Sequence, residues 1–359
     1  MAFVSKIIIY LSAIIFLFGQ IFRINFNGIS FPLIDLSILA LFCLNIFDKF
    51  KNHDLKIKNK YFLYFITFAW ASFIFNIFRY HIDSISPLLY LCRLTFLISF
   101  FIFPLNLKDK NFKNFFTIII ISNIIFGLIQ YFIWPNFTYF DALNWDPHLF
   151  RLVSTFFDPT FTGFIYLMFL IHVYLNPKIP FRWTLLAMTY IALVLTYSRS
   201  SYLSFLLAFT FIALKKKNIK VFLFSSILII STIFLLPRQA GEGTKLERTS
   251  SIKAKIENYQ EGLIVFTRAP IIGHGYNNLY FVRTIKNSNS HANFGFDSSL
   301  ITILTTTGII GLLLFLLGLK NYYTKADLTH QTMLIALLLH SLFANSLLYP
   351  WILLFLVFI

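Results

Sequence analysis

Long runs of apolar residues follow one another along the whole sequence, and they restrict the fold more strongly than any other feature. The run from Ile7 to Phe22, for example, contains no charged residue. A helix that crosses the hydrocarbon layer, about 30 Å thick, needs about 20 mostly apolar residues. Of the 359 residues, 58% are hydrophobic and only 12% are charged. We therefore predict an all-α, polytopic integral membrane protein with about twelve transmembrane helices.

The apolar runs place these helices along the chain. We expect the first run to be retained as a helix, because it is long enough to span and lacks a small-x-small cleavage site. Since no internal repeat or low-complexity linker divides the chain, we treat residues 1–359 as one membrane domain. The predicted spans are residues 7–22, 31–47, 61–78, 85–104, 115–134, 159–176, 184–198, 201–214, 221–236, 297–318, 331–348 and 350–359.

Lysines are concentrated in alternate loops between the spans. The clusters are Lys49, Lys51, Lys56, Lys58 and Lys60, then Lys108, Lys110 and Lys113, then Lys215, Lys216, Lys217 and Lys220. Cytoplasmic loops of membrane proteins carry an excess of Lys and Arg. We therefore predict that these loops and both chain ends face the cytoplasm. The net charge of +16 then reflects membrane topology, and we expect no nucleic-acid partner.

This orientation places two longer segments, residues 135–158 and 237–296, outside the cell membrane. The second is predicted to form a long periplasmic loop that carries an amphipathic helix on the outer surface. Thr249 or Ser250 is its expected N-cap, and Pro270 stops it. Its apolar residues recur at helical spacing: Ile252, Ile256, Tyr259, Leu263 and Phe266. Long loops of this kind are uncommon and tend to be functional.

The predicted outer face is rich in arginine. The guanidinium group binds phosphate in a bidentate manner and stays charged where water is scarce. A cluster of arginines on this face would therefore suit an anionic lipid headgroup. Five members are individually more typical of solvated surface charge: Arg79, Arg238, Arg248, Arg268 and Arg283.

Three further arginines stand in more restrictive surroundings. Arg199 lies between two apolar segments of about 14 residues, about 21 Å of helix each, which predicts a position in a polar cavity below the outer boundary. It is also compatible with an arginine that snorkels from a helix end. Arg93 lies inside a predicted span, where it either faces a cavity or pairs with an intramembrane acid such as Asp35. Arg151 either joins the cluster or is an ordinary interfacial arginine.

Candidate bases are found where the chain enters the tenth span. Asp297 or His291 could take a proton from a sugar hydroxyl at the mouth of a polar cavity. Alternatively, Asp297 or Ser298 is only the N-cap of that helix, and His291 is an exposed loop histidine. His340 and His172, inside spans, are expected to be hydrogen-bonded packing residues.

Other motifs of catalytic or metal sites are missing from the sequence. It has no Cys or His spacing typical of zinc, no P-loop and no nucleophile elbow. We therefore expect no metal and no cofactor. Gly308 and Gly311 stand three apart in an apolar helix, a spacing that permits close packing between helices.

Three blocks of residues, taken together, point to a family. They are Arg151–Pro159 (RLVSTFFDP), Thr196–Ser200 (TYSRS), and Pro270–Gly275 (PIIGHG) with Asp297–Leu300 (DSSL) running into Gly308–Gly311 (GIIG). In this order they resemble the O-antigen polymerase and ligase superfamily of bacteria, over roughly residues 150 to 350.

The resemblance implies a metal-independent glycosyltransferase of the bacterial inner membrane. Its donor would be an undecaprenyl-pyrophosphate-linked glycan at the periplasmic face. Arg151 and Arg199, with Arg93 and Arg268 as further candidates, would bind the pyrophosphate and stabilise it as the leaving group. Asp297 or His291 would activate the acceptor hydroxyl. The implied partners are this donor, a lipid-linked acceptor and the bilayer, with a chain-length regulator as a candidate.

The sequence departs from the ligase pattern at one position. Ligases typically carry His followed by Asn eleven residues before the first glycine of the Gly-x-x-Gly pair, whereas this chain has Asp297 and Ser298 there. An acidic residue resembles the polymerase branch, in which the acceptor is another lipid-linked repeat unit. A ligase that transfers the glycan to lipid A-core is the alternative. A flippase of lipid-linked sugars is the rival from another class, although such transporters often show repeated halves that this sequence lacks.

Overall fold

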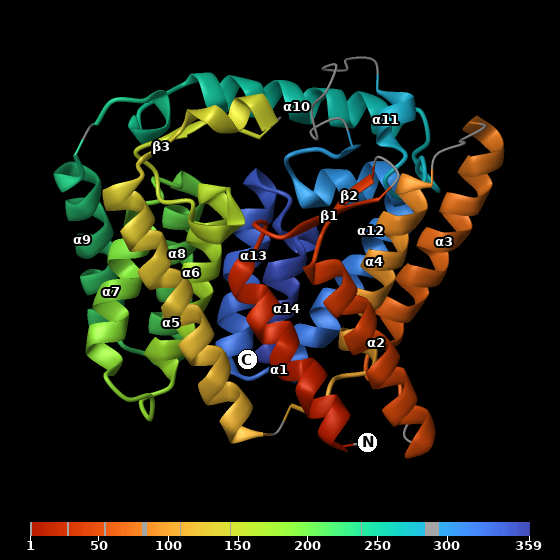
Figure 1. Cartoon of the computed structure of the whole chain (residues 1–359). Coiled ribbons are helices and arrows are strands. Elements are labelled where there is room, and N and C mark those ends of the chain that lie inside the picture. The colour runs from red at the N-terminus through yellow and green to blue at the C-terminus, as the bar shows by residue number, and fades with distance from the viewer. Residues whose placement is uncertain are drawn as a thin grey trace.

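Apolar helices run side by side between two ends of the molecule, as the computed structural model shows (Figure 1). The structure describes residues 2–26, 29–53, 55–80, 85–107, 109–143, 145–237, 239–283 and 294–359. The apolar helices are α1 (Ala2–Phe18), α2 (Ile34–Lys51), α3 (Lys60–Tyr80), α4 (Ser86–Ile102), α5 (Lys110–Ile133), α6 (Pro159–Leu175), α7 (Arg182–Val194), α8 (Arg199–Lys215), α9 (Ile219–Leu235), α12 (Ser299–Lys325), α13 (Leu328–Phe343) and α14 (Pro350–Phe358).

The remaining elements are short or lie across one end of these helices. They are α10 (Ser250–Thr267) and α11 (Leu279–Val282), with the antiparallel pairs β1 (Arg23–Phe26) with β2 (Ile29–Pro32) and β3 (Asn136–Phe137) with β4 (His148–Leu149). Helices dominate the described chain, which confirms the predicted all-α class apart from these two small ribbons.

Each predicted span overlaps one of the apolar helices. Three of them, α3, α5 and α12, are long and apolar enough to cross a membrane by length and composition. Six further helices are apolar but shorter, among them α4, α6 and α13. The helix positions are therefore confirmed, and the number of membrane crossings remains a prediction.

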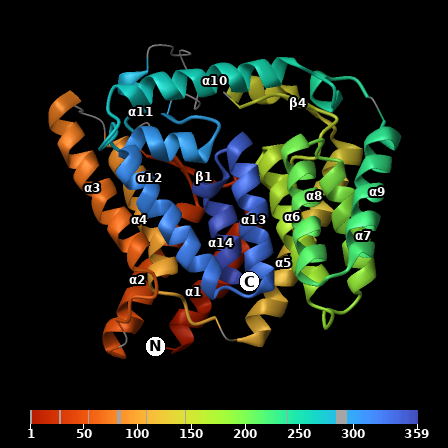
Figure 2. The same ribbon diagram turned by 180° about the vertical axis from the view of Figure 1, so that it is seen from behind.

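The lysine-bearing loops lie at one end of the molecule. Both chain ends lie at one end, together with the lysine-bearing loops that follow α2, precede α5 and join α8 to α9 (Figure 1). Helix α10 lies across the opposite end, and Figure 2 shows the same arrangement from behind. The lysines of the described loops thus share one face, as the alternation along the sequence indicates.

Helix α6 is largely buried among its neighbouring helices. Twelve of its 17 residues are buried, including the run from Phe164 to Ile171. It contacts α7, α8 and α13, so three helices from the second half of the chain surround it. This packing holds the start of α6, which follows the cap Asp158, in place. The start of α6 lies at the end of the molecule that α10 crosses (Figure 1).

The length of α8 differs from expectation. The two apolar segments beside Arg199 were each expected to have about 14 residues, but α8 has 17 and begins at Arg199 itself, with Ser198 as N-cap. The hydroxyl of Ser198 accepts from the Ser201 amide, so the polar turn after α7 ends in the N-cap of α8 and separates the two helices. Only α7, with 13 residues, is as short as expected.

Helix α10 is confirmed as a helix, but its packing face differs from its apolar stripe. Its buried residues are Gly262 and Val265, which face α12. By contrast Ile252 and Ile256 are 48% and 52% exposed. These two residues, with Tyr259, line a cavity between α10 and the elements below, so this part of the apolar stripe is open to solvent and not packed.

A break in α12 explains Gly308. Its φ of +65° is in the left-handed region, and an added Cβ would lie 2.2 Å from the backbone oxygen of Ile271. The amides of His274 and Gly275 donate to the carbonyl oxygens of Thr305 and Thr306, at 3.0 and 2.8 Å. Gly308 therefore admits the backbone of the 270–275 turn, and the expectation that it serves packing between helices was wrong.

Candidate active site

Two neighbouring cavities lie beneath α10. The first, here called the arginine cavity, has a volume of about 470 Å³ and is lined by Arg151, Arg199, Arg248, Ser198, Ser251, Leu203, Ile252, Ile256 and Tyr259. The second, the carboxylate cavity, has about 500 Å³ and is lined by Asp146, Asp158, Asp297, Arg93, Tyr90, Tyr276 and Asn345 among others. Thr160, Lys255 and Phe343 line both cavities.

Hydrogen bonds to backbone carbonyls hold the three guanidinium groups of the arginine cavity. Arg151 is 8% exposed, and its Nε donates to the Thr196 carbonyl oxygen at 2.9 Å. Arg199 Nη1 donates to the carbonyl oxygen of Arg248 at 2.9 Å, and its Nη2 donates to the hydroxyl of Ser251. These bonds join the Tyr197–Ser201 turn to the start of α10. A carbonyl orients a guanidinium group but does not neutralise its charge.

The charge of this cluster is not compensated by paired acids. Among the residues that the structure describes, no carboxylate forms an ion pair with Arg151, Arg199 or Arg248. Burial first, and then the positive charge of Arg248, lower the pKa of Arg151 to about 10. Burial and the charge of Arg199 likewise lower the pKa of Arg248. Arg151 is still protonated at neutral pH, so an anion bound in the cavity would offset the repulsion between the guanidinium groups.

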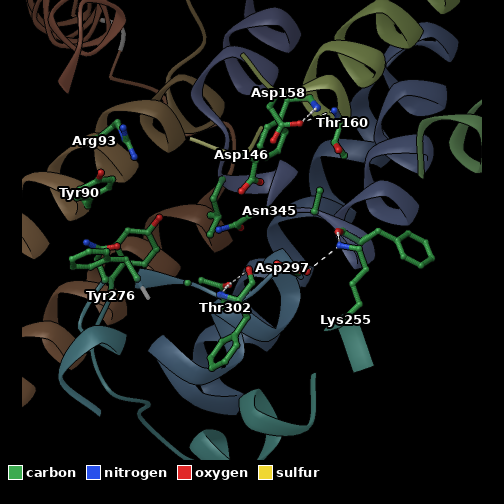
Figure 3. A pocket seen from close by; sticks show the side chains of 18 residues that line it. Tyr90, Arg93, Asp146, Asp158, Thr160, Lys255, Tyr276, Asp297, Thr302 and Asn345 are labelled. Carbon is green, nitrogen blue, oxygen red and sulfur yellow. Dashed lines mark hydrogen bonds and ion pairs between the residues drawn. The ribbon is translucent and has the colours of Figure 1, made fainter. Parts of the chain in front are cut away.

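The carboxylate cavity has acids on two sides (Figure 3). Asp158 caps α6, and its Oδ1 accepts from the amides of Thr160 at 2.6 Å and Phe161 at 3.3 Å. Burial raises the pKa of the Asp158 carboxyl. Asp146 is exposed and lines the same space. Such groups accept hydrogen bonds from sugar hydroxyls.

Arg93 lies across this cavity with Tyr90 and Tyr276 (Figure 3). Its Nη1 is 3.3 Å from Oδ2 of Asp35, so the structural pair that the sequence left open is present. The guanidinium also lies over the ring of Tyr90, 4.4 Å from its centroid. Because Arg93 lines the cavity as well, pairing with Asp35 does not remove it from the site.

Asp297 lies where the two cavities meet. Its Oδ2 accepts from Nζ of Lys255 at 3.0 Å, and its amide donates to Oδ1 of Asn258 at 2.9 Å. Ser298, not Asp297, is the N-cap of α12, with its hydroxyl 3.5 Å from the Ile301 amide. Asp297 is therefore not the cap of α12. It forms an ion pair with Lys255 at the wall of the carboxylate cavity.

The remaining candidates are distributed differently. Arg268 donates to the carbonyl oxygen of Val282 at 3.3 Å and is not among the residues that line either cavity. His291 lies outside the described residues, as do Arg238 and Lys108. Arg248 was expected to be a solvated surface charge, but the structure places it in the arginine cavity.

Three histidines are engaged in packing or hydrogen bonds. His340 is fully buried, with Nδ1 2.5 Å from the Ser346 hydroxyl and Nε2 3.1 Å from that of Ser200. His172 is hydrogen-bonded to Asn176. These contacts confirm the expected packing role. Burial lowers the pKa of His274, which is 2.9 Å from the Val265 carbonyl oxygen.

Lys255 and Asp146 were not found from the sequence. Lys255 stands between Ile252 and Ile256 on α10, and a lysine beside an apolar stripe was the available signal. Asp146 carried no such signal, since its loop has no helical or strand periodicity. Within the described ranges, no group of three or more His, Cys, Asp and Glu side chains is placed to hold a metal ion.

Part of the chain matches a known protein family. Residues 183–316 match the model of a family described as O-antigen ligase. The matched range includes the Arg199 turn, all of α10, Asp297 and the break at Gly308. Arg151 and Arg93 lie before it. No curated protein matches the chain.

Proposed function

We propose that this chain, which residues 183–316 place in the O-antigen polymerase and ligase superfamily, polymerises undecaprenyl-pyrophosphate-linked O-antigen repeat units. It is a multi-pass bacterial membrane protein, as its family and its apolar helices indicate. The observation that carries the proposal is the group of Arg151, Arg199 and Arg248 in one cavity without a paired acid in the described chain.

The proposed donor has three parts, and each finds a complementary surface. Its pyrophosphate suits the three guanidinium groups. Its prenyl tail suits the apolar wall of the arginine cavity, formed by Leu203, Ile252 and Ile256. Its sugars suit the carboxylate cavity, where Asp146 and Asp158 accept hydrogen bonds from hydroxyl groups.

The proposed reaction is a displacement at the anomeric carbon of the donor. The acceptor hydroxyl oxygen forms the new glycosidic bond while the bond to the phosphate oxygen breaks. Undecaprenyl pyrophosphate leaves with the electron pair, and the arginines stabilise its added negative charge. The acceptor proton passes to Asp297, the carboxylate where the two cavities meet. No step uses a metal ion or a cofactor.

The same proposal orients the chain in the membrane. The lysine-rich end, with both chain ends, faces the cytoplasm, and α10 faces the periplasm. The apolar helices then make twelve crossings of the inner membrane, and residues 237–296 form a periplasmic loop within a single membrane domain. Helices as short as α7, 13 residues, require the bilayer to thin locally or polar groups to snorkel.

Polymerase and ligase remain the two candidate activities. Asp297 stands where ligases typically carry histidine, which favours the polymerase. The description of the matched family as O-antigen ligase favours the second candidate, transfer of the glycan to lipid A-core.

The lipopolysaccharide ladder of a deletion strain separates the two. Loss of a polymerase leaves lipid A-core that carries one repeat unit. Loss of a ligase leaves bare lipid A-core and accumulates lipid-linked polymer. A ladder identical to that of the parent strain would contradict both activities.

A further inference from the structure

Lys255 stands on the boundary between the two cavities. It lines both of them, together with Thr160 and Phe343. It comes from α10, and its Nζ is 3.0 Å from Oδ2 of Asp297 and 2.5 Å from the carbonyl oxygen of Phe343 (Figure 3). One ammonium group therefore contacts the entry to α12 and the end of α13 at the same point.

Both contacts of Lys255 are with negative partners. Asp297 is a carboxylate, and Phe343 is the last residue of α13, where the unsatisfied carbonyls form the negative end of the helix dipole. An ammonium group has three N–H bonds. The two contacts leave the third available to a ligand in the arginine cavity, which Lys255 also lines.

We propose that Lys255 is a catalytic residue that bridges the donor pyrophosphate and Asp297. Its third N–H binds the phosphate in the arginine cavity while the ammonium group holds the Asp297 carboxylate oriented toward the acceptor hydroxyl. Two oxygens bound to one nitrogen at about 2.8 Å and tetrahedral angles lie about 4.6 Å apart. The lysine thus holds the leaving group and the base at one reacting centre. Holding reacting groups in the correct geometry lowers the entropic part of the activation barrier.

Among the ionisable groups around Asp297 in the described chain, Lys255 is the one at ion-pair distance. The other ionisable groups that face this carboxylate are Tyr259 on α10, Arg93 on α4, Asp146 and Asp158 before α6, and Tyr276 before α11. Arg283 is paired with Glu261, and its Nη1 donates to the Gly295 carbonyl oxygen at 2.9 Å. Within the described chain, Lys255 is the ion-pair partner of Asp297.

Loss of this bridge affects both the affinity for the donor and the rate at saturating donor. Without its ion-pair partner, the Asp297 carboxylate is no longer held toward the acceptor hydroxyl, so the rate at saturating donor falls as well. A residue that only pins α10 to the end of α13 would leave both values unchanged in the protein that folds.

The inference rests on the proposed function, and four variants test it separately. Purified protein in liposomes is supplied with undecaprenyl-pyrophosphate-linked repeat units, and polymer formation is measured against donor concentration. Binding of undecaprenyl pyrophosphate alone is measured in parallel. Lys255→Met removes the charge and both hydrogen bonds, and Lys255→Gln removes the charge but keeps a donor for Phe343. Lys255→Arg keeps the charge, and Lys253→Met, at an exposed position of the same helix, is the control.

Lys255→Met and Lys255→Gln are expected to bind undecaprenyl pyrophosphate about tenfold more weakly, in line with one lost charge-assisted hydrogen bond. Both should also lower the rate at saturating donor, whereas Lys255→Arg and Lys253→Met keep it. If Lys255→Gln retains the wild-type affinity and rate, the bridge is wrong, and this holds even when Lys255→Met fails to insert. If the wild type neither binds undecaprenyl pyrophosphate nor forms polymer, the proposed function itself fails.

Discussion

Arg199 donates a hydrogen bond from Nη1 to the backbone carbonyl oxygen of Arg248, at 2.9 Å. The bond joins residues 49 positions apart and brings two guanidinium groups into one cavity with Arg151. Arg199 therefore has two tasks, because it holds the start of α10 in place and contributes charge to the cavity.

Arg199→Ala and Arg151→Ala are expected to lower polymerisation by about 10²- to 10³-fold, because each removes a donor to the developing charge on the leaving group. Arg199→Lys should fail as well, since a point charge cannot reach the several acceptors that the planar fork reaches. The measurement is the O-antigen ladder at equal protein level in the membrane. Arg79→Ala, at an exposed arginine outside both cavities, is the matched control. Near-normal polymer length in Arg199→Ala would assign Arg199 to snorkelling alone.

Asp297→Asn is expected to reduce the rate by about 10²- to 10⁴-fold, the usual contribution of a general base. Binding of undecaprenyl pyrophosphate should change little, because the phosphate lies in the other cavity. The comparison is with Glu257→Gln, an exposed acid on α10 that lines neither cavity. A rate for Asp297→Asn within a factor of two of the parent would exclude Asp297 as the base.

Gly308→Ala is expected to destabilise the protein by about 1–3 kcal/mol, because its φ of +65° is strained for alanine and the new Cβ meets the Ile271 carbonyl. The measurement is the thermal unfolding temperature in detergent. Ile310→Ala, which truncates a side chain that is 38% exposed two positions away, should change it far less. Equal unfolding temperatures for the two variants would show that α12 does not need the break.

His148 is expected to make folding sensitive to acid. Burial, and secondly the charge of Arg151, lower the pKa of His148 to about 3, well below its value of 6.5 when unfolded. The unfolded chain therefore binds more protons below pH 6.5, and stability is lost as the pH falls from 6.5 toward 3. His148→Gln should flatten this part of the curve of unfolding temperature against pH. A variant curve parallel to that of the parent would contradict the assignment.

The helices could be predicted because their cause is local. An apolar run of about 20 residues has one stable arrangement in a membrane, and the amphipathic spacing from Ile252 to Phe266 identified α10 before its position was known. The lysine clusters likewise marked one end of the molecule. These features depend on neighbours along the sequence.

The site could be predicted only in part because its contacts depend on packing. The arginines were recognised as a group, but the sequence could not show that Arg248 joins Arg199 while Arg268 turns to Val282. Lys255 reaches Asp297 across 42 positions, and nothing in either local sequence encodes that approach. The break at Gly308 was missed for the same reason, since the segment that it admits precedes it by about 35 residues.

Formation of the glycosidic bond by the purified protein is the most direct test of the central claim. Liposomes that contain only this chain and undecaprenyl-pyrophosphate-linked repeat units are incubated, and the products are separated by size. We expect a ladder of lipid-linked polymer, with one molecule of undecaprenyl pyrophosphate released for each glycosidic bond formed. Movement of the repeat units across the bilayer with no product longer than one unit would contradict it.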